Sequence, residues 1–142
     1  MSSIVKFFVA APSDATDALT HGPGASLPSI VFGNFDAEEA LLNWEAHLTG
    51  STFDELLDRD IPVVFAEEED GPTVFLLSDE LLAELTGSPS SRIGETANWW
   101  AAKTAEDGFP VDAFVALRIL EDLVRLIREE RPSGESVYCW TA

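Results

Sequence analysis

The fold is decided by the run Ile61-Pro62-Val63-Val64-Phe65-Ala66, the turn Asp70-Gly71-Pro72 and the run Thr73-Val74-Phe75-Leu76-Leu77. The two outer runs are rich in β-branched and aromatic residues, which favour strands. Asp-Gly-Pro is turn chemistry, because Gly adopts conformations that other residues avoid and Pro fixes the backbone of a turn. The stretch therefore predicts a β-hairpin with strands at Ile61–Ala66 and Thr73–Leu77.

Further strands are predicted at both ends of the chain, over Ile4–Ala10 and Ser136–Trp140, and Ser29–Phe32 has the pattern of a short strand or bridge. We expect the two terminal strands to join the hairpin in one mostly antiparallel sheet of about four strands. Because helical segments separate the strands, the sequence predicts an α+β fold with several helices packed against this sheet. A chain of 142 residues has the usual length of one domain, so residues 1–142 are predicted to be a single domain.

The helices are predicted from capping signals and from apolar positions three and four residues apart. Asp36 and Glu39 have capping-box spacing and begin a helix that runs to about Leu48. Shorter helices are expected near residues 52–57, 79–85 and 92–106, and residues 12–28 are expected to be mostly loop with one helical turn.

The longest helix is predicted over Val111–Arg131, with Pro110 at its start and Pro132-Ser133-Gly134 after its end. Its apolar stripe is predicted to consist of Ala113, Leu117, Leu120, Val124 and Ile127, widened by Phe114, Leu123 and Leu126. A stripe this wide predicts that the helix packs on one face of the sheet.

The chain is strongly acidic, with 26 Asp and Glu against 8 Lys and Arg, and its formal net charge is −18. Such a field repels phosphates and anionic lipids, so we expect no binding to nucleic acid or to membranes. The same charge suits a basic protein partner or a cation. Cys139 is the only cysteine, which is typical of a reducing compartment and predicts a cytoplasmic protein. Arg outnumbers Lys six to two, which suggests a bacterium with a GC-rich genome.

The sequence offers no recognised catalytic motif: the nucleophile elbow, the phosphate-binding loop and the dinucleotide fingerprint are all missing from it. The only histidines are His21 and His47, and one cysteine with two distant histidines cannot build a structural zinc site. We therefore expect no catalytic residue, no cofactor and no metal ligand.

Two acidic clusters leave an alternative open. Asp54 and Asp58 share one face of a short helix, and Glu67 begins a run of four acids. Together with His47 these carboxylates are candidates to line a pocket. The alternative function is therefore a small enzyme, or a domain that binds a ligand or metal in a carboxylate-lined pocket.

Trp99 and Trp100 are neighbours on a predicted helix, so their side chains point about 100° apart. Trp100 shares a line with Ile93 and Ala97, and we expect it to enter the core. Trp99 is then expected on the flank, where a half-exposed ring can anchor a partner or a second copy of the chain in a homodimer.

Several segments together resemble the YfbM-like group of small uncharacterised bacterial proteins. They are the strand after Met1, the helix end Trp44–Gly50, the stretch Asp70–Ser78 leading into a helix, and the long helix followed by a last strand. The resemblance implies an α+β fold and no catalytic residue.

The missing catalytic motifs, the charge and the flanking tryptophan predict a protein-binding or regulatory module for a basic protein partner. The candidate binding residues are Trp99, His47, Asp54, Asp58 and Glu67.

Overall fold

The computed structural model describes residues 4–131 and 135–142, and over these residues five strands form one open antiparallel sheet in the order β2-β1-β5-β4-β3. The strands are β1 (Val5–Ala10), β2 (Ser29–Phe32), β3 (Val63–Glu67), β4 (Thr73–Leu76) and β5 (Ser136–Thr141). The predicted α+β class is confirmed. The sheet has one strand more than the expected four, because Ser29–Phe32 pairs with β1 along its whole length.

The two ends of the chain meet at the centre of the sheet, as predicted. β5 pairs with β1 from Val5↔Thr141 to Ala10↔Ser136, and on its other side it pairs with β4. The predicted hairpin forms the remaining edge, where β3 and β4 are antiparallel neighbours. β3 begins at Val63 rather than Ile61, consistent with Pro62 having no N–H to donate to a ladder.

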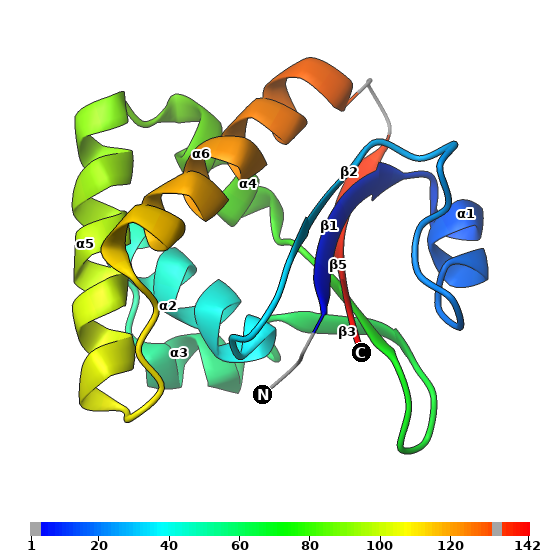
Figure 1. Cartoon of the computed structure of the whole chain (residues 1–142), viewed down its shortest axis with the longest axis horizontal. Coiled ribbons are helices and arrows are strands. Elements are labelled where there is room, and N and C mark those ends of the chain that lie inside the picture. Colours follow the sequence, from blue (N-terminus) through cyan, green and yellow to red (C-terminus); the bar gives the residue numbers. More distant parts are fainter. Residues whose placement is uncertain (1–3, 132–134) are drawn as a thin grey trace.

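The described part of the chain contains six helices, and Figure 1 shows α1 (Pro12–Asp17) on one side of the sheet and the other helices on the opposite side. They are α1 (Pro12–Asp17), α2 (Ala37–Thr49), α3 (Phe53–Asp58), α4 (Asp79–Gly87), α5 (Ser90–Glu106) and α6 (Ala113–Glu130). The helical turn expected within residues 12–28 is α1, which lies over the second face of the sheet.

The start of α6 differs from the prediction. Asp112 is its N-cap and accepts hydrogen bonds from the backbone N–H groups of Phe114 and Val115, which leaves Pro110 in the preceding loop. Ala113 is exposed and Phe114 is 84% exposed, so the places of both in the predicted apolar stripe were wrong. Phe114 lies nine positions before the buried Leu123, and at 100° per residue these two side chains point in opposite directions. The predicted helix end at Pro132-Ser133-Gly134 lies outside the described residues.

The main core fills the space between the sheet and helices α2, α4, α5 and α6. A line of aromatic rings crosses it: Phe7 of β1 contacts Trp44 of α2, with ring centroids 6.0 Å apart, and Trp44 contacts Trp100 of α5 at 5.0 Å. Trp100 is 1% exposed, as predicted, and Trp99 is half-buried on the flank of α5. A second, smaller core lies on the other face of the sheet, around Tyr138 and Trp140.

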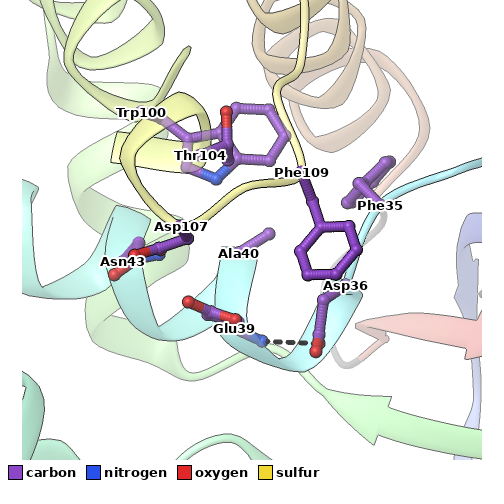
Figure 2. A pocket seen from close by; sticks show the side chains of 9 residues that line it. All are labelled: Phe35, Asp36, Glu39, Ala40, Asn43, Trp100, Thr104, Asp107 and Phe109. Carbon is purple, nitrogen blue, oxygen red and sulfur yellow. Dashed lines mark hydrogen bonds between the residues drawn. The ribbon is translucent and has the colours of Figure 1, made fainter. Parts of the chain in front are cut away.

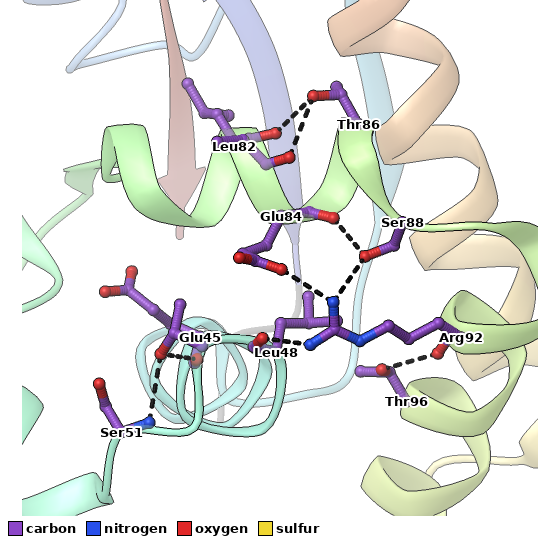
Figure 3. Close-up of polar contacts among 11 residues, drawn as sticks. Glu45, Leu48, Ser51, Leu82, Glu84, Thr86, Ser88, Arg92 and Thr96 are labelled. Atoms are coloured by element: carbon purple, nitrogen blue, oxygen red, sulfur yellow. Dashed lines mark hydrogen bonds and ion pairs between the residues drawn. The ribbon is translucent and has the colours of Figure 1, made fainter.

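Polar contacts tie α5 to α2 and α4 (Figure 3). The Arg92 guanidinium donates to Glu84 at 2.9 Å and to the Ser88 hydroxyl at 3.3 Å, both from α4 or its C-cap. It also donates to the backbone carbonyl of Leu48 near the end of α2. Because Arg92 lies in the first turn of α5, these contacts fix the start of α5 against the end of α2.

The burial of the two tryptophans predicts different costs of truncation. Trp100→Ala should lower the free energy of unfolding by about 3–5 kcal/mol, because it leaves a cavity in the main core. Trp99→Ala should cost about 1 kcal/mol, since the half-buried ring contributes mainly a stacking contact. Urea denaturation of both variants measures the difference. Equal, large losses would show that both rings are part of the core.

Candidate functional site

A pocket of about 160 Å³ lies between the first turns of α2, the last turns of α5 and the loop that leads to α6 (Figure 2). It combines acidic, aromatic and amide side chains. The residues that line it are Phe35, Asp36, Glu39, Ala40, Asn43, Trp100, Thr104, Asp107 and Phe109.

One wall is the first two turns of α2. Asp36 is the N-cap, and its carboxylate accepts a hydrogen bond from the backbone N–H of Glu39 at 3.1 Å. Positions 36, 39, 40 and 43 follow the spacing of one helix face, so the cap also places the pocket side chains Glu39 and Asn43. The helix start that the sequence predicted at Asp36 is thus one wall of the site.

The other wall depends on Thr104 near the end of α5. Its hydroxyl donates to the carbonyl of Ala101 at 2.8 Å and accepts from the backbone N–H of Val111 at 3.0 Å. The Thr104 carbonyl accepts from the backbone N–H of Phe109 at 3.1 Å. Gly108 has φ of +89°, a conformation that favours glycine, and it turns the chain so that residues on both sides of it reach the pocket.

Three carboxylates share this small space, and they repel one another. Burial raises the pKa of Glu39 above its ordinary value, and Asp107 raises the pKa further through a side-chain hydrogen bond and its negative charge. Asp36 acts in the same direction, and Lys103 opposes the rise. The pocket therefore has an excess of negative charge that a cation would neutralise.

Asn43 is a buried polar side chain whose hydrogen bonds are unused. It is 2% exposed and lines the pocket, yet its amide makes no hydrogen bond to any described residue. Buried amides in folded proteins almost always have a partner, so an unused amide at a cavity is available to a ligand or to water. The site thus offers carboxylate oxygens and an amide above an aromatic wall.

Two of the candidate residues predicted from the sequence come together on the same two helices, although neither lines the pocket. His47 lies one helical turn after Asn43, and its ring stacks on Trp99 with centroids 4.6 Å apart and an interplanar angle of 23°. Burial lowers the pKa of His47, and the positive charge of Arg92 lowers it further, against an opposing effect of Glu95. The pair forms a part-buried aromatic surface on α2 and α5.

The other candidates lie elsewhere. Asp54 and Asp58 are exposed on α3, and Glu67 is exposed at the end of β3. None of them lines the pocket, so a role for them in binding stays a prediction. Within residues 4–131 and 135–142, no group of three or more His, Cys, Asp or Glu side chains is arranged to hold a metal ion.

Sequence reasoning missed the pocket carboxylates because each already had a local explanation. Asp36 and Glu39 read as a capping box, and Asp107 read as the end of a helix. The sequence did show acidic residues at the start of α2 and at the end of α5. Only the packing of α2 on α5 shows that these two helix ends meet.

Comparisons of this chain with protein-family models, with curated proteins and with solved structures gave no match. They do not bear on the resemblance to the YfbM-like group, which stays a prediction. Among the described helices, none has the length and apolar character needed to cross a bilayer.

The raised pKa of Glu39 predicts a pH-dependent gain of stability in Glu39→Gln. The pKa of Glu39 is higher in the folded state than in the unfolded state. The wild type therefore loses stability as the pH rises from the unfolded-state pKa to the folded-state pKa, and the loss is complete at neutral pH. The variant should be more stable at pH 7 by about 0.5 kcal/mol, since solvent screens a partly exposed carboxyl, and the gain should vanish below about pH 4.

Denaturant unfolding at several pH values measures this difference. Glu38→Gln is the matched control, because Glu38 is an exposed neighbour that does not line the pocket. A pH-independent gain, or the same gain in the control, would contradict the prediction.

Proposed function

We propose that the protein is a binding module for a basic protein partner, and that the carboxylate pocket anchors this partner. The observation that carries the proposal is the meeting of Asp36, Glu39 and Asp107 in one aromatic-walled pocket on a chain with a net charge of −18. We further propose, from the sequence, that the protein is cytoplasmic and that it regulates its partner by binding it.

The net charge of the protein supports this function because its electrostatic field acts over a long distance. A net negative field attracts a basic protein before contact and raises the rate of productive encounters. The field alone gives little specificity, because exposed charges are screened by salt over about 8 Å at physiological ionic strength. A concave site with three carboxylates supplies a specific point of attachment within that field.

Exposed aromatic side chains supply the apolar part of such an interface. Phe109 is 65% exposed at the rim of the pocket, and Phe114 is exposed in the first turn of α6. The stacked pair of His47 and Trp99 lies further along α2 and α5. Aromatic side chains next to a charged pocket are typical of the residues that dominate binding energy in protein interfaces.

A second candidate function uses the same pocket: a small enzyme, or a domain that binds a small ligand between its carboxylates. The observation that favours it is the placement of Glu39 and Asp107 in one pocket, where burial first and Asp107 second raise the pKa of Glu39. Such a pair holds a proton more tightly than an isolated carboxylate and can exchange it with a bound substrate.

The partner proposal predicts salt-sensitive capture of a basic protein that depends on the pocket. The wild type should retain such a protein from a lysate of the native host at low salt and release it at high salt. A variant carrying Asp36→Asn, Glu39→Gln and Asp107→Asn should lose most of the capture. Asn still caps a helix, so α2 should remain intact in this variant.

The control removes the same number of charges elsewhere, by Glu69→Gln, Glu121→Gln and Glu129→Gln at exposed positions outside the pocket. Capture should persist in this control. Failure to retain any basic protein at low salt would contradict the proposal, and so would an equal loss in both triple variants.

A further inference from the structure

The size of the pocket limits what can enter it. Its volume of about 160 Å³ is close to that of a cavity that holds one benzene molecule, about 150 Å³. Pockets that bind drug-sized ligands usually measure about 300–1,000 Å³. The pocket therefore fits a single side chain and is too small for a nucleotide or a folded segment.

The polar groups of the pocket are mostly acceptors. Asp36, Glu39 and Asp107 present carboxylate oxygens, and the buried Asn43 amide, which has no partner among the described residues, presents a carbonyl oxygen beside its NH2 group. A guanidinium group has five N–H donors and no acceptor, and it keeps its charge at every physiological pH. It also matches carboxylates with two parallel hydrogen bonds, which an ammonium group cannot do.

Aromatic side chains form part of the pocket wall. The ring centroids of Phe35 and Trp100 are 5.5 Å apart, and the two rings are nearly perpendicular, at 82°. Both rings are buried and line the pocket. Phe109 lies at the exposed rim. Arginine stacks on aromatic faces more often than lysine does, because its guanidinium is planar and weakly hydrated.

From these features we infer that the pocket receives the guanidinium group of an arginine side chain from the partner protein, held by Asp36, Glu39, Asp107 and Asn43. This inference rests on the proposed function and names the group that the partner inserts. The inserted charge neutralises the three carboxylates, and the Asn43 amide completes the hydrogen bonds of the guanidinium at the buried end. The alkyl stem of the arginine passes Phe109 at the rim.

The test is a titration of the ¹⁵N-labelled protein, followed by NMR, with a blocked peptide that contains one arginine between glycines. The side-chain amide of Asn43 and the indole N–H of Trp100 should shift, with a dissociation constant in the millimolar range expected for one side chain. The indole of Trp140 is an internal control, because it donates to Leu19 at 2.7 Å in the smaller core on the other face of the sheet.

Two further peptides define the chemistry. The lysine peptide should bind several-fold more weakly than the arginine peptide, and the citrulline peptide, a neutral analogue of the same shape, should cause almost no shift. Asp107→Asn should weaken binding of the arginine peptide about tenfold, the loss expected for one charge-assisted hydrogen bond. Glu106→Gln, at an exposed neighbouring position outside the pocket, should leave it unchanged.

Several outcomes would overturn the inference. Equal binding of lysine and arginine peptides would refute the guanidinium assignment while leaving the proposed function intact. Equal shifts with citrulline would show that the charge is not recognised. Tighter binding of free arginine than of the blocked peptide would assign the pocket to a small molecule rather than to a partner's side chain. Shifts confined to signals outside the pocket would remove the pocket from the interface.

Discussion

The contact between Trp44 and Trp100 is the interaction on which the architecture of the helical side depends. It is the middle link in a line of rings that starts at Phe7 in the centre of the sheet and ends at Phe35. Trp44 belongs to α2 and Trp100 to α5, so the contact sets how these two helices cross. The pocket opens where they meet, and Trp100 is itself part of its wall.

The two helices run in opposite directions across this contact, and a different kind of interaction fixes each end. Arg92 holds the start of α5 to the end of α2 through the carbonyl of Leu48. At the opposite end, Asp36 and Glu39 of α2 face Thr104 and Asp107 of α5 across the pocket. Hydrogen bonds and an ion pair stabilise the first end, whereas the second gathers like charges. Such a local conflict within a consistent fold is typical of a functional site.

Local signals in the sequence were sufficient to predict most elements of the fold. The hairpin turn, the cap at Asp36 and the terminal strands each depend on residues close together in the chain, and the structure confirms them. The position of Phe114 was predicted wrongly. At 100° per residue the expected stripe covered more than half of the helix circumference, and Phe114, at its edge, is exposed to solvent. The pocket was not predicted because residues 36–43 and 100–109 meet only through tertiary packing.

Helical geometry alone predicted which of the two tryptophans is buried, but not what the other one contacts. Adjacent residues on a helix point about 100° apart, and the alignment of Trp100 with Ile93 and Ala97 indicated that Trp100 is the ring that enters the core. The same geometry could not show that His47 would stack on Trp99, because that contact needs the crossing of α2 and α5. The sequence thus identified both members of the pair, and the fold joined them.

Net charge and pocket charge have different consequences for binding. Most of the acids are exposed, and each interacts with a distant cation only through water and salt, which weakens the attraction. In the pocket, Asp36 and Asp107 are also exposed, whereas Glu39 is half-buried, and partial burial strengthens a charge pair at the same distance. Under the proposed function, the whole surface attracts a basic partner and the pocket is the point that holds it. The raised pKa of Glu39 reflects first its burial and then the neighbouring carboxylates Asp107 and Asp36, both of which disfavour its negative charge.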